Sequence, residues 1–353
     1  MPPRKDSDTG INRLFRGSDK MDRRSVLGLG AAAVAGLAAQ ARAADPVPTT
    51  DRLAGDPSET IRLWPHTPPG GEGVHLTLQL LERSPTPDIF HDRFVTDIQE
   101  PLLTVFRPDK PDGSALLVAP GGGYRRVVID KEGFEAAHRL NGSGVTVFNL
   151  RYRLPFEGWA NGADVPLQDA QRAMRLIRAR AADFAIDPKR VGVLGFSAGG
   201  HVAASLITRA DEPVYKPVDK LDALDARPDF AGLMYPVISM TPPIAHAGSR
   251  EKLLGASPSE AQQMLYSPDR HVTSNVPPTF ILLAADDKEV DPRNSLDMAA
   301  ALRAAGVPTE FHMFEEGGHG FGLRLIQGKP AAIWPDLFLR WGARHGVFKN
   351  VVI

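Results

Sequence analysis

The sequence has no cysteine, few aromatic residues and no strong excess of charge of either sign. Its 353 residues include 41 Lys and Arg against 42 Asp and Glu, and aromatic side chains make up 7%. The absence of cysteine excludes disulfides, thiolate zinc sites and a cysteine nucleophile. The near-neutral balance gives no electrostatic reason to bind nucleic acid or anionic lipid. We therefore expect neither as a partner, and expect the apolar core to stabilise the fold.

The chain also lacks an apolar run suited to anchoring it in a bilayer. The longest run, at residues 26–39, is short and rich in Ala and Gly. It follows the paired arginines Arg23 and Arg24, and a small-x-small site stands at residues 41–43. This three-part layout predicts a cleavable export signal over residues 1–43, of the twin-arginine type.

The predicted signal has consequences for the mature chain. Its cleavage removes eight basic and four acidic residues, which leaves 33 basic and 38 acidic residues and a net charge of −5. The mature form is expected in the periplasm or outside a bacterial cell, with translation starting at Met1 or at Met21. The alternative interpretation is a disordered tail before a core helix.

Beyond the signal we expect a short lead-in and one long domain. Residues 44–73 are rich in Pro, Gly and Thr, and predict an extended segment across the surface. Residues 74–353 alternate helical patterns with apolar runs that are nearly continuous, as in strands covered on both faces. Seven strands are expected, at residues 102–106, 115–120, 145–150, 191–195, 231–237, 279–284 and 310–314.

The segments between these strands carry helix signals. Residues 166–184 place apolar side chains on one stripe and arginines elsewhere, and residues 291–308 begin at an N-cap Asp291. Residues 238–275 lack a strong strand and are expected to pack short helices above the carboxyl ends of the strands. Strands alternating with helices predict an α/β fold, with a mostly parallel central sheet and helices on both faces.

The stretch VGVLGFSAGGHVAASL places Ser197 between a predicted strand and a predicted helix. A G-x-S-x-G motif alone is weak evidence for a nucleophile, because about one chain in seven of this composition would contain the motif by chance. A nucleophile at the apex of a strand–turn–helix needs small neighbours, which Gly195 and Gly199 provide. Ser197 is therefore the candidate nucleophile, and the alternative is a small residue at a sharp bend.

A serine nucleophile requires a base, and the base requires an orienting carboxylate. His319 lies among four glycines just after the last predicted strand, and is the candidate base. Asp286 and Asp287 both follow the preceding strand directly, and either could orient the base. The order Ser, Asp, His leaves room for a strand and a helix between each pair, and so supports a catalytic triad.

Acyl transfer also needs hydrogen-bond donors for the developing oxyanion. One is the backbone amide of Ala198, the residue after the nucleophile. Three glycines, residues 121–123, directly follow a predicted strand and let backbone amides approach a substrate. Removing one such donor typically costs about 3 kcal/mol of transition-state stabilisation. The alternatives for these glycines are a flexible turn or a phosphate-binding loop, but no Lys-Ser/Thr pair follows them.

The chain from about residue 64 onward resembles a known group of enzymes. It is similar to the α/β-hydrolase fold serine esterases of the acetylxylan-esterase and bacterial feruloyl-esterase-like group, relatives of the hormone-sensitive-lipase type. The pieces that carry the resemblance are LWPHTPPG, VAPGGGYRRV, NLRYRLP, DAQRAMRLIR, IDPKRVGVLGFSAGGHVAA, LMYPVISM, ADDKEV and EGGHGFGL.

The resemblance implies roles for particular residues. Ser197 is the expected nucleophile, His319 the base and Asp287, in preference to Asp286, the orienting carboxylate. The expected oxyanion donors are Gly122, Gly123 and Ala198. Tyr124 and His201 are candidates for contact with the acyl or sugar portion of a substrate, and packing is the alternative for His201.

The resemblance also implies an activity. We expect an ester hydrolase without cofactor or metal, acting on short acyl esters, with acetyl groups on xylan or xylo-oligosaccharides as the leading substrates. Pro120 stands where lipase relatives have the His of an H-G-G-G loop, as is common in the acetylxylan-esterase group. The alternatives are a peptidase related to prolyl peptidases, or a non-catalytic carbohydrate-binding homologue.

Overall fold

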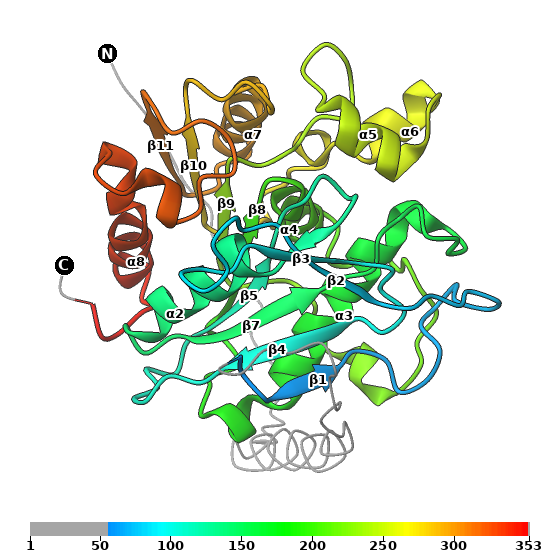
Figure 1. Cartoon of the computed structure of the whole chain (residues 1–353), viewed down its shortest axis with the longest axis horizontal. Coiled ribbons are helices and arrows are strands. Elements are labelled where there is room, and N and C mark those ends of the chain that lie inside the picture. The colour runs from blue at the N-terminus through cyan, green and yellow to red at the C-terminus, as the bar shows by residue number, and fades with distance from the viewer. Residues whose placement is uncertain (1–55, 352–353) are drawn as a thin grey trace, which may run out of the picture.

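The computed structural model describes residues 56–351 (Figure 1). The predicted export signal and the first part of the lead-in, residues 44–55, lie outside these residues. No helix between residues 56 and 351 is long and apolar enough to span a membrane.

An eight-stranded sheet runs through the centre of the molecule, in the order β1-β4-β7-β5-β8-β9-β10-β11 (Figure 1). Strands from β7 onward in this order pair in parallel, whereas β1 with β4 and β4 with β7 pair antiparallel. The predicted mostly parallel sheet is therefore confirmed. The strands are β1 (Thr60–Arg62), β4 (Leu102–Phe106), β5 (Ala115–Ala119), β7 (Thr146–Arg151), β8 (Val191–Phe196), β9 (Ala231–Met234), β10 (Thr279–Ala284) and β11 (Thr309–Phe314).

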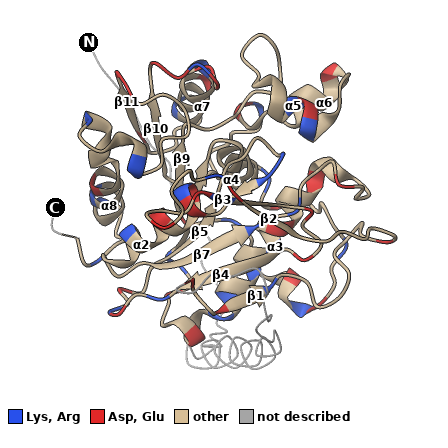
Figure 2. Cartoon of the chain, in the orientation of Figure 1, with Lys and Arg blue, Asp and Glu red and all other residues tan. Residues whose placement is uncertain are grey.

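Five helices cover the two faces of this sheet. Along β5, Leu117 and Ala119 join one apolar core, and Leu116 and Val118 join the other. The first core contains side chains of α3 (Val165–Ala179), α4 (Ala198–Thr208) and α7 (Arg293–Ala304), and the second those of α2 (Glu135–Asn141) and α8 (Trp334–Arg344). Because both faces are covered, the central strands are apolar at almost every position. Figure 2 shows the charged residues of both signs mainly on helices and turns around that sheet.

The lead-in and a second sheet differ from the sequence-based expectation. Part of the predicted surface lead-in is strand β1, whose Ile61 is buried against the edge of the main sheet. A three-stranded antiparallel sheet, β2-β3-β6, was not anticipated, because its strands are very short or largely exposed and show no apolar run. Its strands are β2 (Gln79–Glu82), β3 (Arg93–Thr96) and β6 (Val127–Val128).

Residues 238–275 form short helices, as expected. They are α5 (Ala247–Leu254), α6 (Glu260–Leu265) and the 3-10 turn η6 (Pro268–Arg270), and Figure 1 shows α5 and α6 at the upper right. His246, just before α5, faces Gly123, which follows the carboxyl end of β5: a Cβ at Gly123 would lie 3.9 Å from its ring. The remaining turns are the π-helical η2 (Asp130–Phe134) and the 3-10 turns η3 (Gly162–Asp164), η4 (Ala181–Phe184), η5 (Lys220–Ala223), η7 (Arg324–Ile326) and η8 (Pro330–Ile333).

Candidate active site

Ser197 lies on a tight turn between β8 and α4. Its φ of 53° and ψ of −119° are strained for a residue with a side chain. Glycines make the turn possible: a Cβ at Gly195 would overlap the carbonyl oxygen of Gly199, and one at Gly199 would overlap that of Ala119. The strain and the close packing hold the serine hydroxyl at the end of the strand.

His319 and Asp287 extend from Ser197 in one hydrogen-bonded line. Ser197 Oγ lies 2.8 Å from His319 Nε2, and His319 Nδ1 lies 2.6 Å from Asp287 Oδ2. The other carboxylate oxygen of Asp287 accepts the backbone amides of Glu289 and Val290, at 2.9 and 3.0 Å. The carboxylate is therefore fixed on both sides, and it fixes the imidazole with a proton on Nδ1 and a lone pair toward the serine.

The two neighbouring aspartates have different surroundings. Asp287 is buried and binds the His319 ring, whereas Asp286 is exposed and accepts the backbone amide of Gly318 at 2.7 Å. Only Asp287 reaches the imidazole, in agreement with the preference for it over Asp286.

The glycine loop after β5 leaves free donors beside the serine. The amide of Gly121 is engaged by the Glu132 carboxylate at 2.9 Å, and a Cβ at Gly121 would lie 2.8 Å from that of Ser197. The next two glycines, Gly122 and Gly123, have φ values of 133° and 65°. Within residues 56–351, neither their amides nor that of Ala198 donates a hydrogen bond. Ala198 opens α4, so the helix dipole adds partial positive charge at this point.

Tyr124 directly follows the glycine loop and His201 lies on α4, and neither is on an open surface. Both are buried, and the Tyr124 hydroxyl lies 2.7 Å from His201 Nδ1. His201 Nε2 lies 2.7 Å from the carbonyl oxygen of Tyr266, so it donates there and Nδ1 accepts from the tyrosine. Burial lowers the pKa of His201 to about 4. Their polar atoms are already satisfied, so the expected substrate contact finds no support, and the geometry favours the packing alternative.

Sequence reasoning missed His246 at the edge of the site. With Gly248, Asp287 and Glu289 it lines a cavity of about 470 Å³ beside the triad carboxylate. Burial, and then the nearby His319, lower the pKa of His246. The sequence held no strong signal for this residue, because it lies in a loop whose position depends on tertiary packing.

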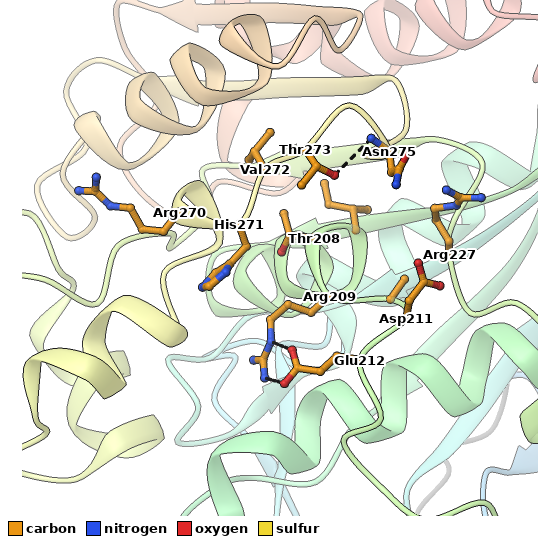
Figure 3. A pocket seen from close by; sticks show the side chains of 12 residues that line it. Thr208, Arg209, Asp211, Glu212, Arg227, Arg270, His271, Val272, Thr273 and Asn275 are labelled. Atoms are coloured by element: carbon orange, nitrogen blue, oxygen red, sulfur yellow. Dashed lines mark hydrogen bonds and ion pairs between the residues drawn. The ribbon is translucent and has the colours of Figure 1, made fainter.

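A second cavity lies away from these reactive groups. Figure 3 shows its lining at the far end of α4, which lies about 15 Å from Ser197 at 1.5 Å per helical residue. Arg209 in its wall is paired with Glu212, at 2.5 Å. It contains no part of the candidate triad.

Comparison with known proteins identifies the family of this fold. Residues 120–323 match the family described as alpha/beta hydrolase fold. The chain therefore belongs to the alpha/beta hydrolase fold family. It is 31% identical over 232 residues to an acetylxylan esterase of Xylanibacter ruminicola, covering 65% of this chain and 45% of that protein.

Other relatives point in the same direction. An endo-1,4-beta-xylanase B of Butyrivibrio fibrisolvens is 34% identical over 254 residues, covering 68% of this chain and 39% of that protein. The chain thus spans less than half the length of these two relatives. The crystal structure of an acetyl ester-xyloside bifunctional hydrolase from Caldicellulosiruptor lactoaceticus superposes with a TM-score of 0.65 at 33% identity, covering 82% of this chain and 97% of that one. The predicted resemblance to acetylxylan-esterase-type hydrolases is confirmed.

Proposed function

We propose that this protein is a serine carboxylesterase that removes acetyl groups from xylan or xylo-oligosaccharides. The observation that carries the proposal is the hydrogen-bonded line from Ser197 Oγ through His319 to Asp287, at 2.8 and 2.6 Å. Beside it lie three backbone amides that donate no hydrogen bond to any residue that the structure describes. A nucleophile, a base, an orienting carboxylate and oxyanion donors are the parts that acyl transfer requires.

Each part has a step in the proposed reaction. Ser197 Oγ attacks the ester carbonyl while His319 Nε2 takes its proton, and Asp287 stabilises the imidazolium that forms. The amides of Gly122, Gly123 and Ala198 donate to the oxyanion of the tetrahedral intermediate. His319 then gives this proton to the departing sugar oxygen, which leaves as a hydroxyl while the acetyl group stays on the serine. Water then attacks the acetyl carbonyl while His319 takes its proton, and His319 returns the proton to Ser197 Oγ as acetate leaves.

The substrate class is supported by similarity rather than by contacts. Two of the relatives above are named for acetyl ester hydrolysis, one on xylan and one together with xyloside hydrolysis. The cavity beside Asp287 and His246 is a suitable place for part of a substrate, because it adjoins the triad and is open to solvent.

The test compares wild type with Ser197→Ala on p-nitrophenyl acetate and on acetylated xylo-oligosaccharides. We expect both activities in the wild type and a loss of about 10⁴-fold or more in the variant. Unchanged turnover in Ser197→Ala contradicts the nucleophile assignment. If the wild type hydrolyses the aryl acetate but not the oligosaccharides, the protein is an esterase and the proposed xylan substrate is wrong.

We also propose that the protein acts outside the cytoplasm. The support is the twin-arginine-type signal in the sequence. Replacing Arg23 and Arg24 by Lys should retain the protein in the cytoplasm with residues 1–43 uncleaved. Export of this variant at the wild-type level contradicts the twin-arginine route.

A further inference from the structure

Glu132 is a buried carboxylate between two loops of the proposed active site. Glu132 is 3% exposed. Among the described residues, no Lys, Arg or His forms an ion pair with its carboxylate. One oxygen accepts the Gly121 amide at 2.9 Å, and the other accepts the Tyr235 hydroxyl at 3.0 Å. Burying a carboxylate without a cation costs free energy, which these two hydrogen bonds partly offset.

The first of these bonds holds the glycine loop. Gly121 directly precedes the two proposed oxyanion glycines and lies between Glu132 and Ser197. A Cβ placed on Gly121 would lie 2.6 Å from Glu132 Oε2 and 2.8 Å from the Cβ of Ser197. Only a glycine therefore fits between these two side chains, and the hydrogen bond from the Gly121 amide to Glu132 holds the loop at this place.

The second bond reaches the loop that carries His319. The Tyr235 hydroxyl donates to Glu132 and accepts the backbone amide of Gly322 at 3.0 Å. The Tyr235 ring meets the His319 ring edge to face, with centroids 5.2 Å apart. Burial, and then the Glu132 charge, raise the pKa of Tyr235 far above its ordinary value, so its hydroxyl keeps the proton that it donates.

We propose that Glu132 is a positioning residue that ties the oxyanion loop to the histidine loop, an inference that rests on the proposed function. Each of its two oxygens accepts a hydrogen bond from a different loop. A side-chain amide has only one oxygen, and its NH₂ group cannot replace the second acceptor. When both bonds are present, the amides of Gly122 and Gly123 and the His319 ring keep a fixed geometry about Ser197. Movement of either loop by about 1 Å would weaken transition-state stabilisation more than substrate binding.

Glu132→Gln tests the need for two acceptors. The glutamine oxygen can still accept the Gly121 amide, but its NH₂ group then faces the Tyr235 hydroxyl and leaves that proton without an acceptor. We expect kcat for p-nitrophenyl acetate to fall by about 10- to 100-fold, with KM changed by less than about threefold. Tyr235→Phe keeps the ring but removes the histidine-loop bond, and should lower kcat by about 10-fold.

The double variant separates a shared role from two independent ones. Without the tyrosine hydroxyl, the glutamine has no conflicting donor to face. The loss in Glu132→Gln/Tyr235→Phe should therefore be smaller than the product of the two single losses. Asp130→Asn is the matched control, because Asp130 is also buried and lies two residues earlier, but pairs with Arg93 at 2.6 Å. It should lower the melting temperature and leave kcat unchanged.

Ser197→Ala in the same assay distinguishes a failure of the Glu132 positioning role from a failure of the proposed esterase function. If Ser197→Ala is inactive while Glu132→Gln and Tyr235→Phe keep wild-type kcat, the positioning role is wrong and the esterase stands. If Ser197→Ala remains active, both are wrong. Multiplicative losses in the double variant, or an equal kcat loss in Asp130→Asn, also overturn the positioning role. If Glu132→Gln does not fold, the Tyr235→Phe variant tests the positioning role by itself. A wild-type kcat in Tyr235→Phe then refutes the proposal.

Discussion

Asp286 and Asp287 are adjacent in sequence, yet they hold different parts of the loop that carries His319. Asp287 binds the ring at Nδ1, at 2.6 Å, and Asp286 binds the backbone amide of Gly318, at 2.7 Å. One carboxylate therefore orients the base, and its neighbour anchors the chain just before the base. This division of roles can be tested with two matched substitutions.

Asp287→Asn should lower kcat by about 10⁴-fold, because an asparagine amide can donate to Nδ1 and favour the imidazole tautomer that cannot accept the serine proton. Asp286→Asn keeps an oxygen acceptor for the Gly318 amide and should change kcat by less than about threefold. Steady-state hydrolysis of p-nitrophenyl acetate measures both. A large loss in Asp286→Asn with near-normal turnover in Asp287→Asn would reverse the assignment.

The turn at Ser197 predicts a steric effect on stability. A Cβ at Gly199 would overlap the carbonyl oxygens of Ala119 and Pro120, so Gly199→Ala should cost about 2 kcal/mol or more in the free energy of unfolding. Gly142 is the control, because its φ is −56° and a Cβ there meets only the Arg139 carbonyl oxygen, at 3.5 Å. Gly142→Ala should leave stability unchanged or raise it by up to about 1 kcal/mol. Urea unfolding measures both, and equal stability in the two variants contradicts the packing argument.

A buried ion pair predicts a second stability effect. Arg153 and Asp169 are both fully buried and lie 2.9 Å apart, and the Trp64 indole also donates to Asp169. Arg153→Met leaves the carboxylate buried and unpaired, which should cost about 3–5 kcal/mol. The exposed pair Arg62–Glu100 is the control, since Arg62→Met should cost less than about 1 kcal/mol. A similar shift of the urea midpoint in both variants would be the contrary result.

The low pKa of His201, about 4, predicts an acid-sensitive fold. Between pH 6.5 and pH 4 the unfolded chain binds a proton at this residue that the folded chain does not. Stability therefore rises with pH in this window, and acidification through it should cost up to about 3 kcal/mol. His201→Gln carries no such group, so its unfolding free energy should fall less between pH 7 and pH 4.5 than that of the wild type. Parallel pH dependences of the two proteins refute the assignment.

The predicted strands agree with the structure because their apolar runs are buried on both faces. For example, β4 and β10 have the predicted bounds, and the other five differ by three residues or fewer. The second sheet was not predicted, because β2 is largely exposed and β6 is only two residues long. Such strands depend on pairing with a distant segment, which a local pattern does not show.

The sequence by itself determined the order of Ser197, Asp287 and His319, each at a strand end, and the glycines that allow a tight turn. These features can be read from short stretches of sequence, because a tight strand-to-helix turn and a glycine loop require small residues at fixed positions. The sequence favoured Asp287 over Asp286 only through resemblance, and the tertiary structure brings only Asp287 to the imidazole. It also gave Tyr124 and His201 buried partners and placed Glu132 between two loops, at Gly121 and Gly322, that are 322 − 121 = 201 residues apart in the chain. Those outcomes depend on the distances of a few ångströms that sheet order and helix packing set, and no sequence spacing encodes them.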